Sequence, residues 1–215
     1  MRIGIIGAGA VGGTLARAWA NTGHQVALAT RNPDDPRLAT LALSIGPNAS
    51  AGAVPKVVEH SEVVVLATPW IAVRDMPGVP VEWSGKILID CTNPLRPDFQ
   101  WLEDDYQVSG AERIAAWAEG ASVFKTLNHT GYNNMANPVY PNGQAVMFVC
   151  GDDQAGMPTV LQLVGELGFD AVDAGGLKVA RLLEPLAMLW IQLAMGEGFG
   201  REIAFALLRR AGPAG

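Results

Sequence analysis

The sequence has few charged residues, few cysteines and no cluster of basic side chains. Charged residues make up 17% of the 215 positions and the formal net charge is −6, so nucleic acids and anionic membranes are not expected as partners. Cys91 and Cys150 are the two cysteines. They lie in separate apolar segments without metal-ligand spacing, which favours two reduced thiols over a disulfide and predicts no metal site.

Long apolar runs and a leader segment are also missing. The most apolar stretch, residues 182–195, contains Glu184, Pro185 and Gln192 and is shorter than the roughly 20 residues that cross a bilayer. It is interpreted as a buried helix. With no signal peptide before the first strand, the expected location is the cytoplasm. Hydrophobic residues, at 49%, suffice for a large core, so disorder is not expected.

What the sequence does contain is a glycine-rich turn at its start. An apolar strand over residues 2–6 is followed by Gly7, Gly9 and Gly12, the spacing of a strand-to-helix turn that holds a dinucleotide pyrophosphate. Gly7 allows the tight turn, Gly9 lets phosphates approach the backbone, and Gly12 lets the helix pack on the strand. The residues expected to bind the pyrophosphate are Gly7, Ala8, Gly9, Ala10, Val11 and Gly12.

The second predicted strand, residues 25–29, lacks the acidic residue that usually closes it in NAD-binding domains. Thr30, Arg31 and Asn32 stand there instead. Their hydroxyl, guanidinium and amide groups can donate hydrogen bonds to a 2′-phosphate. No carboxylate is expected there to receive a free 2′-hydroxyl, so NADP is favoured over NAD.

Alternating apolar strands and helices predict an α/β fold, a Rossmann-type doubly wound and mostly parallel sheet with helices on both faces. Ser109 and Glu112 have the spacing of a capping box before a helix, and Asp152 and Asp153 are expected to cap another. Residues 1–175 form the predicted NADP-binding domain and residues 176–215 a C-terminal helical region, helical to about residue 210 with breaks at Pro185 and at residues 196–200. Strands are expected at 2–6, 25–29, 62–67, 86–90, 122–127, 145–150 and 169–173, and helices at 36–43, 54–60, 113–118 and up to 167.

Polar and aromatic residues follow three further strands at the sheet edge where ligands bind in such folds. They are expected to contribute to cofactor binding. Either His129 donates to a carbonyl of the acceptor or it bonds to a neighbouring loop, and either Trp70 stacks on a ring or it caps the core. Because no nucleophile, carboxylate pair or metal cluster accompanies them, no catalytic residue is assigned. The residues are Ala67, Thr68, Pro69, Trp70, Asn93, Asn128, His129 and Thr130.

Several motifs together resemble the NADPH-dependent reductases of the deazaflavin coenzyme F420, whose relatives include the cytoplasmic domain of six-transmembrane metalloreductases. The resemblance implies a Rossmann domain carrying NADP, a small helical C-terminal part that covers the nicotinamide end, and a homodimer. His129 stands where this family more often has threonine. The motifs are the glycine loop with Thr30-Arg31, and residues 67–70, 90–95, 128–138, 151–153 and 173–185.

The expected function is hydride transfer between NADP(H) and a small-molecule electron acceptor of flavin type, coenzyme F420, FMN or FAD. Such a transfer needs two stacked rings in a dry pocket. An alternative is a reductase of a small hydroxy acid, ketone or imine, for which Lys178 offers the usual lysine while Leu182 occupies the place of the usual amide. A third is a non-catalytic NADPH-sensing dimer. The nearly continuous apolar run 182–193 favours a homodimer.

Overall fold

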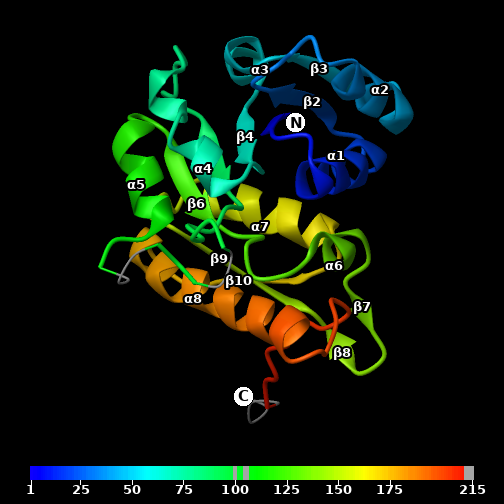
Figure 1. Cartoon of the computed structure of the whole chain (residues 1–215), viewed down its shortest axis with the longest axis vertical. Coiled ribbons are helices and arrows are strands. Elements are labelled where there is room, and N and C mark those ends of the chain that lie inside the picture. The colour runs from blue at the N-terminus through cyan, green and yellow to red at the C-terminus, as the bar shows by residue number, and fades with distance from the viewer. Residues whose placement is uncertain (99–100, 104–106, 211–215) are drawn as a thin grey trace.

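The protein is described from a computed structural model, which covers residues 1–98, 101–103 and 107–210. Within these residues, eight strands form one sheet of order β10-β9-β6-β5-β4-β1-β2-β3, and β7 and β8 form a separate hairpin. Helices cover both faces of the sheet (Figure 1). The predicted doubly wound Rossmann-type α/β fold is confirmed. The strands are β1 Arg2–Ile6, β2 Gln25–Thr30, β3 Ala49–Ala53, β4 Val63–Leu66, β5 Ile87–Asp90, β6 Ser122–Lys125, β7 Val139–Tyr140, β8 Gly143–Gln144, β9 Val146–Gly151 and β10 Asp170–Asp173.

The helices follow the strands as the alternation predicts. The helix over 54–60 has the predicted bounds, and the capping box is present, with Ser109 accepting from the Glu112 amide and Glu112 accepting from the Ser109 amide. The helices are α1 Ala10–Asn21, α2 Pro36–Ile45, α3 Val54–His60, α4 Trp70–Val73, α5 Gly110–Trp117, α6 Tyr132–Ala136, α7 Met157–Glu166 and α8 Ala180–Ile191, with 3₁₀ turns η1 Met76–Gly78 and η2 Leu177–Val179 and a π-helical turn η3 Gln192–Gly196.

Six neighbouring strands run parallel, so their carboxyl ends meet at one edge. Ile6 is in register with Leu66, Leu66 with Asp90, and Asp90 with Lys125. The central strands β1, β4 and β5 are rich in buried isoleucine, valine and leucine, as expected where helices cover both faces. In contrast, β9 pairs antiparallel with β6 and parallel with β10. The ends of β9 and β10 therefore lie at the opposite edge.

Two apolar cores separate the layers. One lies between the sheet and helices α1, α2, α6 and α7, where the fully buried Trp19 donates its indole hydrogen to the carbonyl of Leu163 at 3.0 Å and so joins α1 to α7. The other lies between the sheet and α3, α4, α5 and the start of α8, around Val57, Ile114 and Leu183. The sheet is thus packed on both faces, which holds its carboxyl edge rigid.

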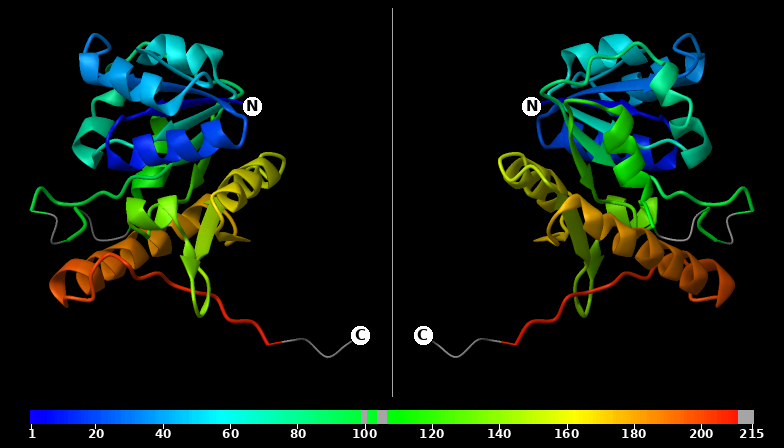
Figure 2. Two further views of the ribbon diagram at one scale, coloured as in Figure 1. Left: turned by 90° about the vertical axis from the view of Figure 1, so that its right-hand side faces the viewer. Right: turned by 90° about the vertical axis from the view of Figure 1, so that its left-hand side faces the viewer.

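The C-terminal region differs from the prediction, because the helical structure ends with η3. Gly198 and Gly200 adopt positive φ angles of 77° and 75°, which an α-helix does not accommodate. Residues 201–210 then run without helix, and the Val146 amide donates to the Phe205 carbonyl at 2.9 Å. Figure 2 shows this segment leaving α8 in extended form below the sheet.

The prediction of a helix break at Pro185 is also wrong, since α8 continues through it. Within the described residues, one helical run, 177–196, is long and apolar enough by length and composition alone to cross a membrane, with a mean hydropathy of 1.2 over its best window. The expectation that this stretch is too short is therefore wrong. Part of it is buried against the rest of the domain, including Leu183, Glu184 and Ala187.

The prediction that Asp152 and Asp153 cap the helix after β9 is wrong. Asp153 accepts from the Ala155 amide at 2.9 Å in the turn before α7, and Asp152 accepts from the Leu177 amide at 2.8 Å at the start of η2. Neither caps α7 directly, because the helix begins later, at Met157. Both acids serve turns at the edge opposite the glycine loop.

Candidate functional site

Two adjoining pockets lie at the carboxyl edge of the parallel strands. The first has a volume of about 560 Å³ and the second about 530 Å³. Gly9, Ala67, Thr68 and Pro69 line both, so together they form one cleft. Predicted site residues line it as follows: Gly7, Ala8, Gly9, Thr30, Arg31, Asn32, Ala67, Thr68 and Pro69 in the first pocket, and Gly9, Ala10, Val11, Ala67, Thr68, Pro69, Trp70 and Asn93 in the second.

The three glycines of the turn have different reasons to be glycine. Gly7 has a φ of 120°, and a Cβ there would lie 2.2 Å from the Ala67 carbonyl oxygen. A Cβ at Gly12 would lie 1.9 Å from the Gly7 carbonyl oxygen. Gly9 has an ordinary extended conformation, with φ −78° and ψ −164°, and among the described residues nothing lies within 4 Å of its Cβ position. The chain itself therefore requires glycine at two positions, while at Gly9 the space opens into the cleft.

That open space suits a pyrophosphate. Gly9 is the N-cap of α1, a 12-residue helix without an acidic residue in its first turn. The amides of Ala10 and Val11 begin this helix, at the positive end of its dipole, where anions bind. The turn thus fits the dinucleotide that the glycine spacing predicts.

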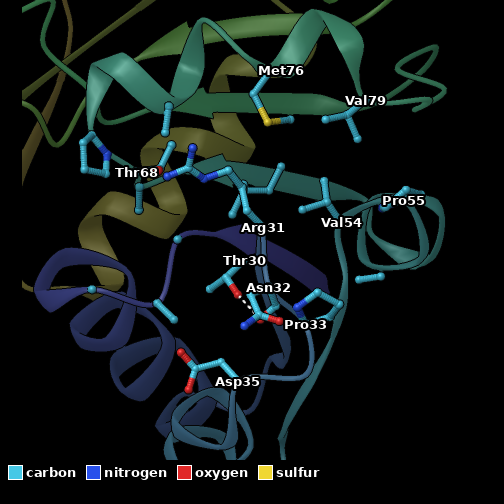
Figure 3. Close-up of a pocket in the computed structure, with 18 residues that line it drawn as sticks. Thr30, Arg31, Asn32, Pro33, Asp35, Val54, Pro55, Thr68, Met76 and Val79 are labelled. Carbon is cyan, nitrogen blue, oxygen red and sulfur yellow. Dashed lines mark hydrogen bonds between the residues drawn. The ribbon is translucent and has the colours of Figure 1, made fainter.

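The first pocket is charged and exposed at its outer end. In Figure 3, Arg31 extends from the end of β2 toward the wall that carries Met76. Its guanidinium lies 3.3 Å from the carboxylate of Asp75, and both side chains are mostly exposed, 77% and 66%. The hydroxyl of Thr30 donates to the carbonyl of Asn32 at 2.8 Å. The predicted donors are therefore present, and one of them already has a carboxylate partner.

A carboxylate does line this pocket, although it lies beyond the strand end to which the expectation applied. Asp35 lines the pocket, three residues beyond Asn32, where the chain turns back from β2 into α2. Asp35 accepts from the Arg37 guanidinium at 2.7 Å and from the Arg37 amide at 2.9 Å. These hydrogen bonds hold the pKa of the Asp35 carboxyl below its usual range. Its acceptor capacity is thus directed to Arg37 and to the first turn of α2.

The second pocket is mainly apolar and is walled by Trp70. The indole of Trp70 donates to Glu103 at 2.7 Å, and the other Glu103 oxygen lies 3.6 Å from Arg74. Trp70 is largely buried, against Gly110 at the start of α5, and belongs to the apolar core, so of the two interpretations the structure favours the core cap. Arg74 and Arg96 bring positive charge to the rim.

The loop after β5 forms the inner wall of the second pocket. Cys91, Thr92 and Asn93 line it, and both cysteines of the chain are free thiols, as predicted. Burial raises the pKa of the Cys91 thiol, and the neighbouring Asp90 raises it further. The Cys91 thiol is therefore held in its neutral form in the folded protein.

Four predicted site residues lie outside the described lining. Gly12 packs beneath the turn, and Asn128 stands behind Asn93, with its amide donating to the Asn93 side-chain oxygen at 2.9 Å. Thr130 accepts from Asn134 at 2.9 Å. His129 is the fourth. Residues 128–130 lie behind the wall of the pocket because they follow β6, which is an inner strand of the sheet next to β9.

His129 is buried in the strand-end layer. Its Nε2 accepts from the Phe148 amide at 3.2 Å, and burial lowers its pKa to about 4. The ring is therefore neutral at physiological pH, with its acceptor nitrogen occupied. Of the two interpretations of His129, the structure favours the hydrogen bond to a neighbouring segment.

Several lining residues were not predicted from the sequence. Their signals are weak, because most are apolar residues of loops and short helices whose position depends on the tertiary fold. Behind the lining, Lys125 has a clearer sequence signal, as a lysine inside an apolar strand. In the first pocket the additional residues are Ile6, Pro33, Asp35, Ala53, Val54, Pro55, Ala72, Met76 and Val79; in the second they are Ile71, Arg74, Cys91, Thr92, Leu95, Arg96, Pro97 and Glu103.

Comparison with known proteins agrees with this geometry. Residues 2–94 match the family described as NADP oxidoreductase, coenzyme F420-dependent. A solved structure of a putative F420-dependent NADP reductase from Arthrobacter sp. FB24 is 31% identical, covers 97% of this chain and all of that one, and superposes with a TM-score of 0.87. The metalloreductase STEAP3 of Rattus norvegicus is 28% identical over 191 residues, 87% of this chain. This chain spans 37% of the length of that curated relative.

Another solved structure shares the fold alone. A reductive aminase from Aspergillus terreus in complex with NADPH is 21% identical, with a TM-score of 0.68 over 92% of this chain and 63% of that one. The chain belongs to the family of coenzyme F420-dependent NADP oxidoreductases. Membership defines the class of NADP-dependent oxidoreductases and does not identify the electron acceptor.

Proposed function

We propose that this protein transfers a hydride between NADP(H) and a flavin-like acceptor, coenzyme F420 or a flavin. The observation that carries the proposal is the continuity of two pockets of different character through Gly9 and the segment 67–69. A dinucleotide needs a polar pocket for its phosphorylated adenosine and an anion site at a helix start. The acceptor ring needs a second, apolar pocket next to the nicotinamide end.

Each part of the cleft has a role in this proposal. Thr30, Arg31 and Asn32 would hold the 2′-phosphate, and the glycine turn would hold the pyrophosphate. The bound nucleotide supplies the hydride. Thr68 and Pro69 would position the reacting end, while the apolar wall beside Trp70 excludes water.

No ionisable side chain is assigned to the chemical step. Among the described residues that line the second pocket, the titratable groups are two rim arginines, the paired Glu103 and the neutral thiol of Cys91. Arginine and a neutral thiol are poor proton donors, and Glu103 already accepts from the Trp70 indole. Hydride transfer between two rings requires none, because orientation supplies most of the rate.

A screen of NADPH oxidation tests the proposal. The acceptors are coenzyme F420, FMN, FAD, quinones, small ketones and imines, with the Gly9→Val variant as a control for a functional cofactor site. The expected result is fastest turnover with F420 or a flavin. Turnover only with a ketone or imine would instead establish the reductase of small carbonyl compounds, and tight NADPH binding with no acceptor reduced would establish a non-catalytic sensor.

The same proposal includes a homodimer formed through α8. Leu182, Leu186, Leu189 and Leu193 recur on one side of α8 and its continuation η3 at the spacing of an apolar stripe, and Leu182 is 69% exposed. Light scattering should give the mass of a dimer, and Leu189→Asp should give a monomer. Leu43→Asp, which changes a single exposed leucine on α2, should leave the dimer intact.

The proposed partners are otherwise small molecules, without nucleic acid or membrane, and the proposed location is the cytoplasm. The acidic net charge and the two free thiols support this, because cytoplasmic thiols remain reduced. Recovery of the protein in a washed membrane fraction after cell lysis would contradict it.

A further inference from the structure

Three charged side chains lie buried together behind the second pocket. Lys125 Nζ lies 2.8 Å from Asp90 Oδ2 and 3.0 Å from Glu184 Oε1, and all three residues are buried. Asp90 and Lys125 are register partners on β5 and β6, whereas Glu184 comes from α8. Burial alone lowers the pKa of Lys125, but the charges of Asp90 and Glu184 outweigh it and hold the pKa above its usual range. The lysine therefore stays charged.

The group holds Thr92 by each of its polar atoms. Asp90 Oδ1 accepts from the Thr92 amide at 2.8 Å and from its hydroxyl at 2.7 Å. Lys125 Nζ donates to the Thr92 carbonyl. Since Thr92 lines the second pocket, its position there depends on the lysine and the aspartate beneath it.

A second connection runs in parallel to the next residue of the loop. The side chain of Asn128 donates both to the Asn93 side-chain oxygen and to the Leu183 carbonyl, each at 2.9 Å. Leu127, just before Asn128, has a φ of 56°, a strained value for a leucine. Neighbouring residues of α8, Leu183 and Glu184, are thus each linked to the loop through one side chain of the β6 end.

Glu184 also ties α8 to α5. Its two oxygens accept from the amides of Gly110 and Ala111 at 3.0 and 3.2 Å. The group has one positive and two negative charges, and the positive end of the α5 dipole offsets part of the excess. Such buried ion groups are weak devices for stability, because apolar residues of similar volume often stabilise a core as well or better. Their directed hydrogen bonds, however, fix relative positions that apolar contacts leave free.

We propose that Lys125 is a positioning residue of the acceptor pocket, which with Asp90 and Glu184 fixes Thr92 and couples its position to helix α8, while Asn128 makes the parallel connection for Asn93. The inference rests on the proposed function only in naming that pocket the acceptor site. The coupling itself follows from the contacts.

The test compares Lys125→Met with Arg181→Met. Arg181 also joins α8 to α5, through Glu112 at 2.7 and 2.8 Å, but it contacts no residue of the loop after β5 in these hydrogen bonds. It is therefore a matched control for the attachment of α8. The first readout is the rate at which iodoacetamide alkylates Cys91, measured on its peptide by mass spectrometry, together with amide hydrogen exchange over residues 91–95. Neither readout needs NADPH or an acceptor.

Lys125→Met should raise both rates about 10-fold or more, whereas Arg181→Met should change them less than twofold even if it lowers the melting temperature. In single turnover with NADPH and F420 or FMN, Lys125→Met should lower hydride transfer about 10- to 100-fold. The dissociation constant of NADPH should stay within about threefold, because the proposed 2′-phosphate contacts lie in the first pocket and, among the described residues, the glycine turn makes no hydrogen bond to the charged group. If the lysine had a purely structural role, Lys125→Met would change both the rate of hydride transfer and the dissociation constant of NADPH, or neither of them.

Equal alkylation and exchange rates in the two variants would overturn the proposal. If Lys125→Met does not fold, Thr92→Val tests the same anchor without leaving a buried charge unpaired. Loss of the hydrogen bond from the Thr92 hydroxyl to Asp90 should raise the rate of Cys91 alkylation about 2- to 10-fold. An unchanged alkylation rate would also overturn the proposal. If none of the screened acceptors is reduced by NADPH in the presence of the unmodified protein, the proposed function fails. The rates of Cys91 alkylation and amide hydrogen exchange still decide this inference.

Discussion

The two pockets of the cleft use ion pairs in opposite ways. At the first pocket, Arg31 and Asp75 are 3.3 Å apart and mostly exposed. Behind the second, Lys125 and Asp90 are 2.8 Å apart and fully buried. An exposed pair contributes about 0–1 kcal/mol, so a bound phosphate can replace the carboxylate as the partner of the arginine. Breaking a buried pair costs roughly 3–5 kcal/mol, so it keeps its geometry through turnover.

This difference matches what each end of a hydride-transferring site requires. The remote phosphate end supplies affinity and discrimination, which an exchangeable arginine can provide. The reacting end requires fixed orientation in a dry pocket. The predictions below ask whether the two ends are as separate as this comparison implies.

The largest effect is expected at Gly9, where the two pockets meet. Gly9→Val should fold, because the backbone conformation suits any residue and the Cβ position is open. It should weaken NADPH binding by about 100-fold or more, since a branched side chain would occupy the place of the pyrophosphate. Titration calorimetry measures the affinity and circular dichroism the fold.

The matched control is Gly165→Val, at an exposed glycine of α7 whose Cβ position is also open. It should leave NADPH affinity unchanged within about twofold, because it is remote from the cleft. Unaltered NADPH affinity in folded Gly9→Val would refute the placement of the cofactor.

The layer behind the second pocket should appear in the pH dependence of stability. Burial lowers the pKa of His129 from 6.5 to about 4, so between these values the unfolded chain binds a proton that the folded chain does not. The contribution of His129 to the free energy of unfolding should therefore be fully present above pH 6.5. It should be lost as the pH drops toward 4, which lowers the free energy of unfolding by up to about 3 kcal/mol.

Urea unfolding between pH 4.5 and 7.5 measures this contribution. His129→Gln should flatten the slope, whereas His60→Gln, at an exposed histidine, should not. Hydride transfer in His129→Gln should fall far less than the roughly 10³-fold within the range of general acid catalysis. A larger loss would show that an ionisable residue takes part in the chemical step after all.

The strands, the glycine turn and the polar lining residues 30–32 could be predicted from the sequence because their signals are local. An apolar run ending in Gly7 defines both a strand and its turn, and Thr30-Arg31 follows the second strand directly. Asp35 has no such signal, because it lies in the adjacent loop and not at the strand end.

Signals that depend on distant segments could not be interpreted in the same way. The acids after β9 look like helix caps until that strand is known to run antiparallel, and the chain after Gly200 looks helical by composition. Lys125 and Glu184 stand out as charges in apolar elements, yet only the register of β5 and β6 and the docking of α8 bring them to Asp90. The positioning group is therefore a product of tertiary structure.

At the exposed end, Arg31→Ala should weaken NADPH about 10-fold and NADH less than twofold. A charge-assisted hydrogen bond contributes roughly 1.5–3 kcal/mol, and release of the Asp75 pair reduces the net value by up to about 1 kcal/mol. The effect should increase at low salt, where screening is weakest. Equal dissociation constants for the two nucleotides in the unmodified protein would contradict the role of Arg31.

The smallest effect, and the sharpest test of an exchangeable pair, is expected for Asp75→Asn. In the structure the Arg31 guanidinium, which would bind the 2′-phosphate, donates a hydrogen bond to the Asp75 carboxylate. Removing the charge of Asp75 should therefore strengthen NADPH binding about 2- to 5-fold. NADH lacks the phosphate, and its affinity should not change. In the double variant with Arg31→Ala the gain should disappear, because Asp75 then has no arginine to withhold. Weaker NADPH binding in Asp75→Asn would show the opposite role, in which the carboxylate orients Arg31 for the phosphate and the first pocket is preorganised like the second.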